Sequence, residues 1–201
     1  MKNKPAAASP EQEILRYIAQ FTQLSQGEAE EILKTIKIKT FKKGATLLKE
    51  GQIAKLCYFV LKGCIRQYYL VDGEERTTNF YTEGQPVTPY GGTFKQEPSK
   101  YYLECVEETT VTAGSPEEEA LFFAKFPRLE PVSRLAVEEE LGKTQDQLST
   151  YILSSPEERY LQLLKTRPDL LDRVPQYQLA SYLGVKPESL SRIRRRVAGL
   201  V

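Results

Sequence analysis

The sequence contains no histidine, and this absence removes several kinds of chemistry at once. Histidine-ligated zinc, haem and facial-triad iron sites all need imidazole ligands. Histidine is also the side chain used most often as a general base. We therefore predict that the protein is not an enzyme, with no catalytic residues, no bound metal and no cofactor.

Cysteine is scarce as well, with only Cys57, Cys64 and Cys105 in the chain. Their wide spacing matches no metal-binding pattern, and three thiols are too few for a four-thiolate iron–sulfur cluster. We interpret them as small apolar core residues.

Long apolar runs are also missing, since no segment approaches the roughly 18 residues of a membrane span. The opening MKNKPAAASP lacks the apolar middle of a signal peptide. We therefore expect residues 1–10 to be a disordered tail, and we expect a cytoplasmic protein without a membrane partner.

Charge is nearly balanced over the whole chain but unevenly distributed along it. From residue 186 onward, five basic residues and one acidic residue give +4. Between residues 103 and 140, ten acidic and three basic residues give −7. This asymmetry indicates an end that faces nucleic acid, attached to an otherwise acidic body.

The basic end carries the pattern of two short helices, in the stretch QYQLASYLGVKPESLSRIRRR at residues 176–196. Gly184 is a helix-ending residue, and Pro187 suits the first position of the next helix. Apolar residues recur at helical spacing on one face of each helix, at Leu179, Ala180, Tyr182, Leu183, Leu190, Ile193 and Val197. The stretch therefore predicts a helix-turn-helix.

The opposite face of the second helix is polar and suits the major groove of DNA. Arginine can donate two parallel hydrogen bonds to guanine, and glutamate can accept one from cytosine. We predict that the base-reading residues are Glu188, Ser189, Ser191 and Arg192. We predict that the residues contacting phosphates are Gln176, Tyr177, Arg195 and Arg196.

Upstream of this stretch the hydrophobic period changes twice. Apolar residues recur at helical spacing over residues 11–21 and 25–36. From there to about residue 113, apolar and polar residues alternate in short runs separated by glycines, as in β-strands. An Asp-Gly pair within residues 71–74 predicts a hairpin turn. We expect an α+β fold in which this middle part is an antiparallel β-roll, a jelly-roll-like double-stranded β-helix. Helices flank the roll, and the helix-turn-helix follows at the C-terminal end.

A long helix is expected at about residues 132–153, before a joint at Ser154 and Ser155. Its apolar positions step by four and three residues, which is the spacing of a two-helix seam, at Val137, Leu141, Thr144, Leu148 and Tyr151. We predict that this seam joins two copies in a homodimer. The alternative is that the helix packs on its own roll.

The second helix, PESLSRIRRR, resembles the recognition helix of the Crp/Fnr transcription regulators at Glu188, Ser191 and Arg192. The order of elements is similar to the family layout, and so is the spacing of Gly44, Gly51, Gly63 and Gly84. The resemblance implies a cyclic-nucleotide-binding-like domain at 11–114, helices including the dimerisation helix at 115–154, and a DNA-binding domain at 155–201. It also implies an inverted-repeat DNA operator, a second copy of the chain and RNA polymerase as partners.

One part of the resemblance fails. Family members that bind cyclic AMP use a Gly-Glu-Leu segment and an Arg-Ser/Thr pair, but neither the glutamate nor the arginine is present in the corresponding segments. A buried phosphate needs charge-assisted donors, of which arginine is the best. The remaining pocket candidates are Thr88, Tyr90, Ser99 and Lys100. We expect no response to cyclic AMP; the effector is another small molecule, or there is none.

Two other classes of protein are compatible with parts of this pattern. A cupin-like barrel enzyme would share the β-roll, but its chemistry needs a histidine-rich metal site. A small-molecule sensor whose helix-turn-helix contacts proteins instead of DNA would share every element. Salt-dependent DNA binding separates this second alternative from a transcription regulator.

Overall fold

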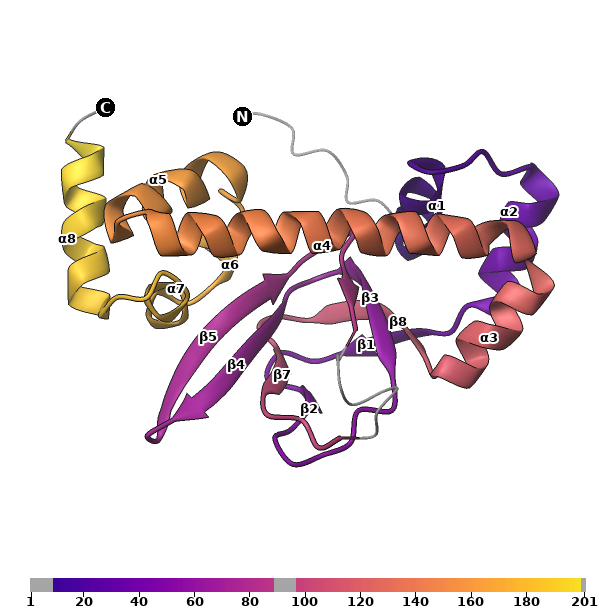
Figure 1. Ribbon diagram of the computed structural model, residues 1–201, viewed down its shortest axis with the longest axis horizontal. Helices are drawn as coiled ribbons and strands as arrows, with labels where there is room; N and C mark the ends of the chain where they lie inside the picture. The colour runs from indigo at the N-terminus through magenta and orange to yellow at the C-terminus, as the bar shows by residue number, and fades with distance from the viewer. Residues whose placement is uncertain (1–8, 89–96, 200–201) are drawn as a thin grey trace.

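The computed structural model describes residues 9–88 and 97–199, which form an antiparallel β-roll followed by a helical C-terminal part (Figure 1). The strands in these ranges are β1 (Ile38–Phe41), β2 (Thr46–Leu48), β3 (Cys57–Lys62), β4 (Ile65–Val71), β5 (Glu74–Tyr81), β6 (Pro86–Val87), β7 (Tyr102–Cys105) and β8 (Thr109–Gly114). They form two four-stranded sheets, in the orders β1–β8–β3–β6 and β2–β7–β4–β5. The predicted α+β fold with an antiparallel roll is confirmed.

The hairpin that joins β4 to β5 is the one that the Asp-Gly pair predicted. Asp72 and Gly73 both have positive φ angles, of 53° and 79°, as a type I′ turn requires. The hairpin is long and extends beyond the rest of its sheet (Figure 1). β5 forms one edge of that sheet, so one side of its backbone has no strand to pair with.

The interior of the roll is made by the inward-facing residues of both sheets. Val60, Ile65, Leu103 and Val111 are completely buried there. Cys105 lies among them, and Cys64 is equally buried in a neighbouring cluster, so the predicted core position is confirmed for these two cysteines, whereas Cys57 is only half-buried. Burial raises the pKa of the Cys64 thiol to about 12, so this thiol stays protonated.

The helices in the described ranges are α1 (Pro10–Ala19), α2 (Gln26–Thr35), α3 (Pro116–Lys125), the 3₁₀ turn η1 (Pro127–Leu129), α4 (Glu130–Leu153), α5 (Pro156–Thr166), α6 (Leu170–Arg173), α7 (Gln176–Tyr182) and α8 (Pro187–Ala198). Four begin with a serine capping box, at Ser9, Ser25, Ser115 and Ser155. The disordered tail predicted at residues 1–10 is wrong for its last two residues, because Ser9 caps α1 and Pro10 begins it; residues 1–8 lie outside the described residues. The single turn α6 was not predicted.

α4 is a 24-residue helix that runs along the whole molecule above the sheets (Figure 1). Ala136 is its one buried residue, so the helix covers little of the roll below it. In the part of the chain that the structure describes, each helix is too short or too polar to cross a membrane.

Candidate nucleic-acid interface

The stretch predicted to be a helix-turn-helix folds into two helices, α7 and α8, with a tight turn between them. Gly184 has a φ of +70°, a left-handed conformation that other residues adopt only with strain. Pro187 is the first residue of α8, and Lys186 caps that helix without a side-chain hydrogen bond. Leu190, Ile193 and Val197 are at most 6% exposed and anchor α8 by one face.

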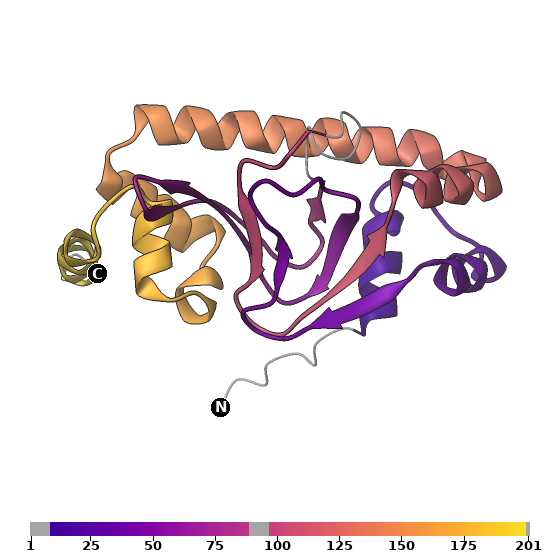
Figure 2. The same cartoon turned by 90° about the horizontal axis from the view of Figure 1, so that it is seen from below.

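The other face of α8 is polar and open to solvent. Glu188, Ser191, Arg192 and Arg195 are all exposed. The guanidinium of Arg192 donates from Nη2 to Ser189 Oγ at 3.1 Å. Since Glu188 and Arg192 are one helical turn apart, both side chains project from the same side of the helix. α8 lies at one end of the molecule, away from the roll (Figures 1 and 2).

The residues predicted to contact phosphate are in more varied surroundings. Gln176 and Tyr177 are exposed at the start of α7. Arg195 is also exposed, and its Nε lies 3.5 Å from Ser191 O. Arg196 instead forms an ion pair with the Glu157 carboxylate of α5, with 2.7 Å between Nη2 and Oε2, so part of its charge is already compensated within the chain.

The predicted dimer seam is an exposed apolar stripe on α4. Val137, Leu141 and Leu148 are 48%, 57% and 60% exposed, and Thr144 is exposed between them. The predicted alternative, in which the seam packs on the roll of its own chain, does not match these exposures. Tyr151 at the end of the seam differs, because its ring also contacts the C-terminal helices.

Arg159 of α5 joins the end of α4 to the turn of the helix-turn-helix. Its guanidinium donates to Tyr151 O and Ser154 O at 3.1 and 2.8 Å, and to Leu183 O at 2.9 and 3.1 Å. It also lies 4.5 Å from the centre of the Tyr151 ring. A Cβ on Gly184 would collide with the hydroxyl of this same tyrosine, so another residue in the turn would have to displace the Tyr151 side chain as well as adopt a strained φ. The sequence analysis did not find Arg159, because its partners are backbone carbonyls.

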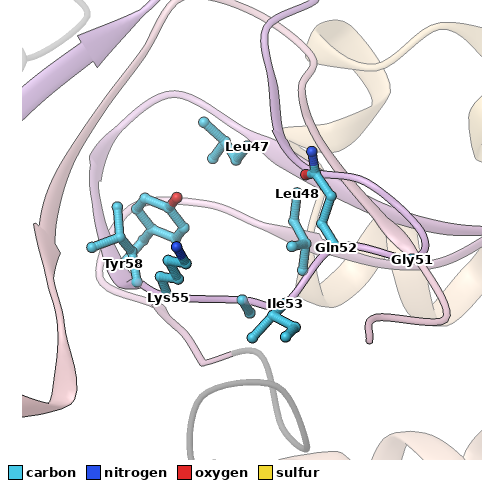
Figure 3. A pocket seen from close by; sticks show the side chains of 9 residues that line it. Leu47, Leu48, Gly51, Gln52, Ile53, Lys55 and Tyr58 are labelled. Atoms are coloured by element: carbon cyan, nitrogen blue, oxygen red, sulfur yellow. The ribbon is translucent and has the colours of Figure 1, made fainter. Parts of the chain in front are cut away.

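An open hollow of about 520 Å³ lies in the roll beside the connection between β2 and β3 (Figure 3). Its walls are mostly apolar, with a few polar side chains, and consist of Leu47, Leu48, Gly51, Gln52, Ile53, Ala54, Lys55, Leu56 and Tyr58. Figure 3 shows Tyr58 and Lys55 on one side and Gln52 and Leu48 on the other. Arginine is absent from this lining.

Of the predicted pocket residues that the structure describes, Thr88, Ser99 and Lys100, none is among those that line this hollow. Ser99 is hydrogen-bonded to the wall of the hollow. Its carbonyl accepts from Gly51 N and its amide donates to Gln52 O, both at 2.8 Å. Lys100 is exposed and Thr88 half-buried, while Tyr90 falls outside the described residues. No group of three or more acidic or cysteine side chains suited to a metal ion occurs in the described ranges.

Comparisons with known proteins agree with this arrangement. The family described as "Cyclic nucleotide-binding domain" matches residues 38–118. A comparison with curated protein sequences finds no match. Among solved structures, the c-di-GMP responsive regulator CLP of Xanthomonas campestris is 18% identical, with a TM-score of 0.67 over 87% of this chain and 92% of that one.

Two other solved structures are similar over most of their length. A variant of CooA from Carboxydothermus hydrogenoformans is 16% identical, with a TM-score of 0.66 over 92% of this chain and 84% of that one. FixK2 from Bradyrhizobium japonicum is 18% identical, with a TM-score of 0.64 over 82% of this chain and 85% of that one. Residues 38–118 thus match the family model of cyclic nucleotide-binding domains, and the chain as a whole has the fold of the Crp/Fnr-type regulators.

Proposed function

We propose that the protein is a homodimeric, sequence-specific DNA-binding transcription regulator of the Crp/Fnr type that acts in the cytoplasm. The observation that carries this proposal is the outward face of α8, where Glu188 and Arg192 are exposed one turn apart on a helix whose other face is buried. Side chains placed in this way reach base edges when the helix enters the major groove. The domain divisions at residues 114 and 154 belong to the same proposal.

The second part of the proposal concerns the partner copy. The apolar stripe of α4 leaves Leu141 and Leu148 more than half exposed, although burying a leucine stabilises an association by about 1.5–3 kcal/mol. A second copy of α4 packed along this stripe would cover them. Two recognition helices would then read an inverted repeat with half-sites about 34 Å apart. RNA polymerase is the further partner that the resemblance implies.

The test is to replace Leu141 and Leu148 together by glutamate. We expect the Leu141→Glu/Leu148→Glu chain to be a monomer in sedimentation and to lose tight binding to an inverted repeat selected with the native protein. The matched control is Leu121→Glu, an exposed leucine of α3 outside the stripe, which should leave both measurements unchanged. A native chain that is monomeric at micromolar concentration and still binds its operator tightly would contradict the dimer. DNA binding that is weak and unaffected by salt would favour the reading in which the helix-turn-helix contacts proteins.

The proposal also includes insensitivity to cyclic AMP. No arginine lines the hollow in the roll, and the predicted phosphate partner Lys100 is an exposed point charge. We expect calorimetric titrations with cyclic AMP and cyclic GMP to show no heat of binding. Saturable binding in the micromolar range would contradict this part of the proposal.

A further inference from the structure

The C-terminal helices α5–α8 are docked on the roll of their own chain. One hydrophobic cluster includes Cys64, Phe80 and Val106 of the roll together with ten residues of α5–α8 and their connections. The ring of Phe80 lies edge-on to that of Tyr182, with 5.3 Å between their centres. Both views show the β4–β5 hairpin reaching α6 and α7 (Figures 1 and 2).

The first polar contact of this interface covers the unpaired side of β5. Ser181 Oγ of α7 accepts a hydrogen bond from Thr77 N at 2.9 Å and donates one to Glu75 O at 3.0 Å. One serine hydroxyl therefore satisfies two of the backbone groups that a neighbouring strand would otherwise pair. An edge strand whose backbone N–H and C=O groups are unpaired can pair with a strand of another chain, and a helix that covers the edge prevents this.

The second and third polar contacts come from two arginines between α5 and α7. Arg167 donates to Phe80 O at 3.0 Å and to Thr82 Oγ1 at 2.9 Å. Arg173 binds Glu83 through both terminal nitrogens, each at 2.9 Å, and it also binds Glu107. Paired bonds of this kind fix orientation as well as distance.

The guanidinium of Arg173 and the carboxylate of Glu83 each shift the pKa of the other. Burial alone would raise the pKa of the Glu83 carboxyl, but hydrogen bonds from Arg173 and from backbone amides, including that of Gly63, lower it overall. Burial alone would lower the pKa of Arg173, yet the carboxylates of Glu83 and Glu107 raise it. Both sides of the pair are therefore charged at neutral pH.

These contacts matter because the covalent connection between α4 and α5 is short and not helical. Ser154 and Ser155 are both extended, with ψ angles of 146° and 161°. Rotation at these two residues would swing α8 relative to α4, and Arg159 bridges the connection through Tyr151 O, Ser154 O and Leu183 O. A second attachment, on the roll, would restrict this rotation further.

We infer that Arg167, Arg173 and Ser181 are positioning residues that fix the direction of α8 relative to the dimer helix and so set the spacing between the two DNA half-sites. This inference rests on the proposed function. None of the three contacts uses a residue of α8, so the docked arrangement leaves the base-reading side chains free. Removing the contacts should relax the spacing requirement without changing how one half-site is read.

The experiment compares operators whose half-sites are separated by one base pair more or fewer than the preferred spacing. The native protein should lose about tenfold or more in affinity for each change, because a rigid dimer can match only one spacing. The Arg167→Gln/Arg173→Gln chain should lose less than about threefold, while its affinity for a single half-site stays unchanged. Arg173→Lys keeps the charge but not the paired geometry, and it should fall between the two.

The matched control is Arg76→Gln, on the same hairpin, whose guanidinium pairs with Glu74 at 2.7 Å. It should retain the native spacing requirement. Denaturation curves establish that each variant folds before its spacing is measured. An unchanged spacing profile in the folded double variant would overturn the inference.

A second measurement tests the docking without DNA. The Thr77 amide is protected by Ser181, so Ser181→Ala and the double arginine variant should both exchange this hydrogen at least about tenfold faster than the native chain. Unchanged Thr77 exchange in both variants would overturn the inference. If the native protein binds no DNA while Thr77 exchange responds as expected, the proposed function fails and the docking stands.

Discussion

α7 and α8 belong to one motif, yet their polar residues are used in opposite ways. On α8 the polar residues such as Arg192 are exposed, and the partner that we propose for them is DNA. On α7 Gln178 is buried, and Ser181 is half-buried with its hydroxyl hydrogen-bonded to β5 of the roll. The comparison teaches that a polar face on a short helix can indicate either an external partner or an internal one, and that burial separates the two cases.

The largest effect should come from the apolar side of the docked helix. Leu179 of α7 is completely buried, so Leu179→Ala should lower the free energy of unfolding by about 2–5 kcal/mol. The control is Gln176→Ala on the exposed start of the same helix, which should change it by less than about 0.5 kcal/mol. Chemical denaturation measures both. If Leu179→Ala lowers the free energy of unfolding by less than about 1 kcal/mol, as a substitution of an exposed residue would, then α7 is not docked as described.

A smaller effect, on DNA binding instead of stability, is expected from the exposed face of α8. Arg192→Ala should leave stability unchanged but cost about 1–3 kcal/mol in operator binding and relax the preference at one position of each half-site. Selection from random DNA followed by sequencing measures this preference. If the native protein and Arg192→Ala select the same motif with equal information, the assignment of base reading to Arg192 is wrong.

The smallest effect should come from the arginine that has a partner within the chain. Arg196→Ala should weaken binding to all DNA sequences alike and flatten the salt dependence by at most about one unit. Because Arg196 is paired with Glu157, Glu157→Gln should strengthen binding, by about 0.2–1 kcal/mol. Titrations at several salt concentrations test both variants. Weaker binding by Glu157→Gln would show that Arg196 needs this partner to reach phosphate.

Features that depend on nearby residues could be predicted from the sequence. The capping boxes at Ser25 and Ser115, the turn at Asp72 and the stripes of α8 all rest on residues at most a few positions apart. Their physical cause is local: a side chain satisfies a nearby amide, or a periodic pattern buries one face.

Features that depend on distant pairs could not be predicted in the same way. Arg173 meets Glu83 and Glu107 across 90 and 66 positions of the chain, and before folding it resembles any solvent-exposed arginine. The hollow in the roll was missed for a related reason. Its walls come from the irregular connection around Gln52 and Lys55, where no periodic pattern marks an inward-facing side chain.

The serine that covers the β5 edge has a consequence for chain synthesis. The ribosome completes the roll at Gly114, 67 residues before Ser181, so the nascent roll has an open edge beside an uncovered Phe80. A fragment that stops at Leu153 would keep that edge permanently and would present it to other copies of itself. The isolated roll is therefore a poor substitute for the full chain in ligand screening, since self-association would compete with whatever is being measured.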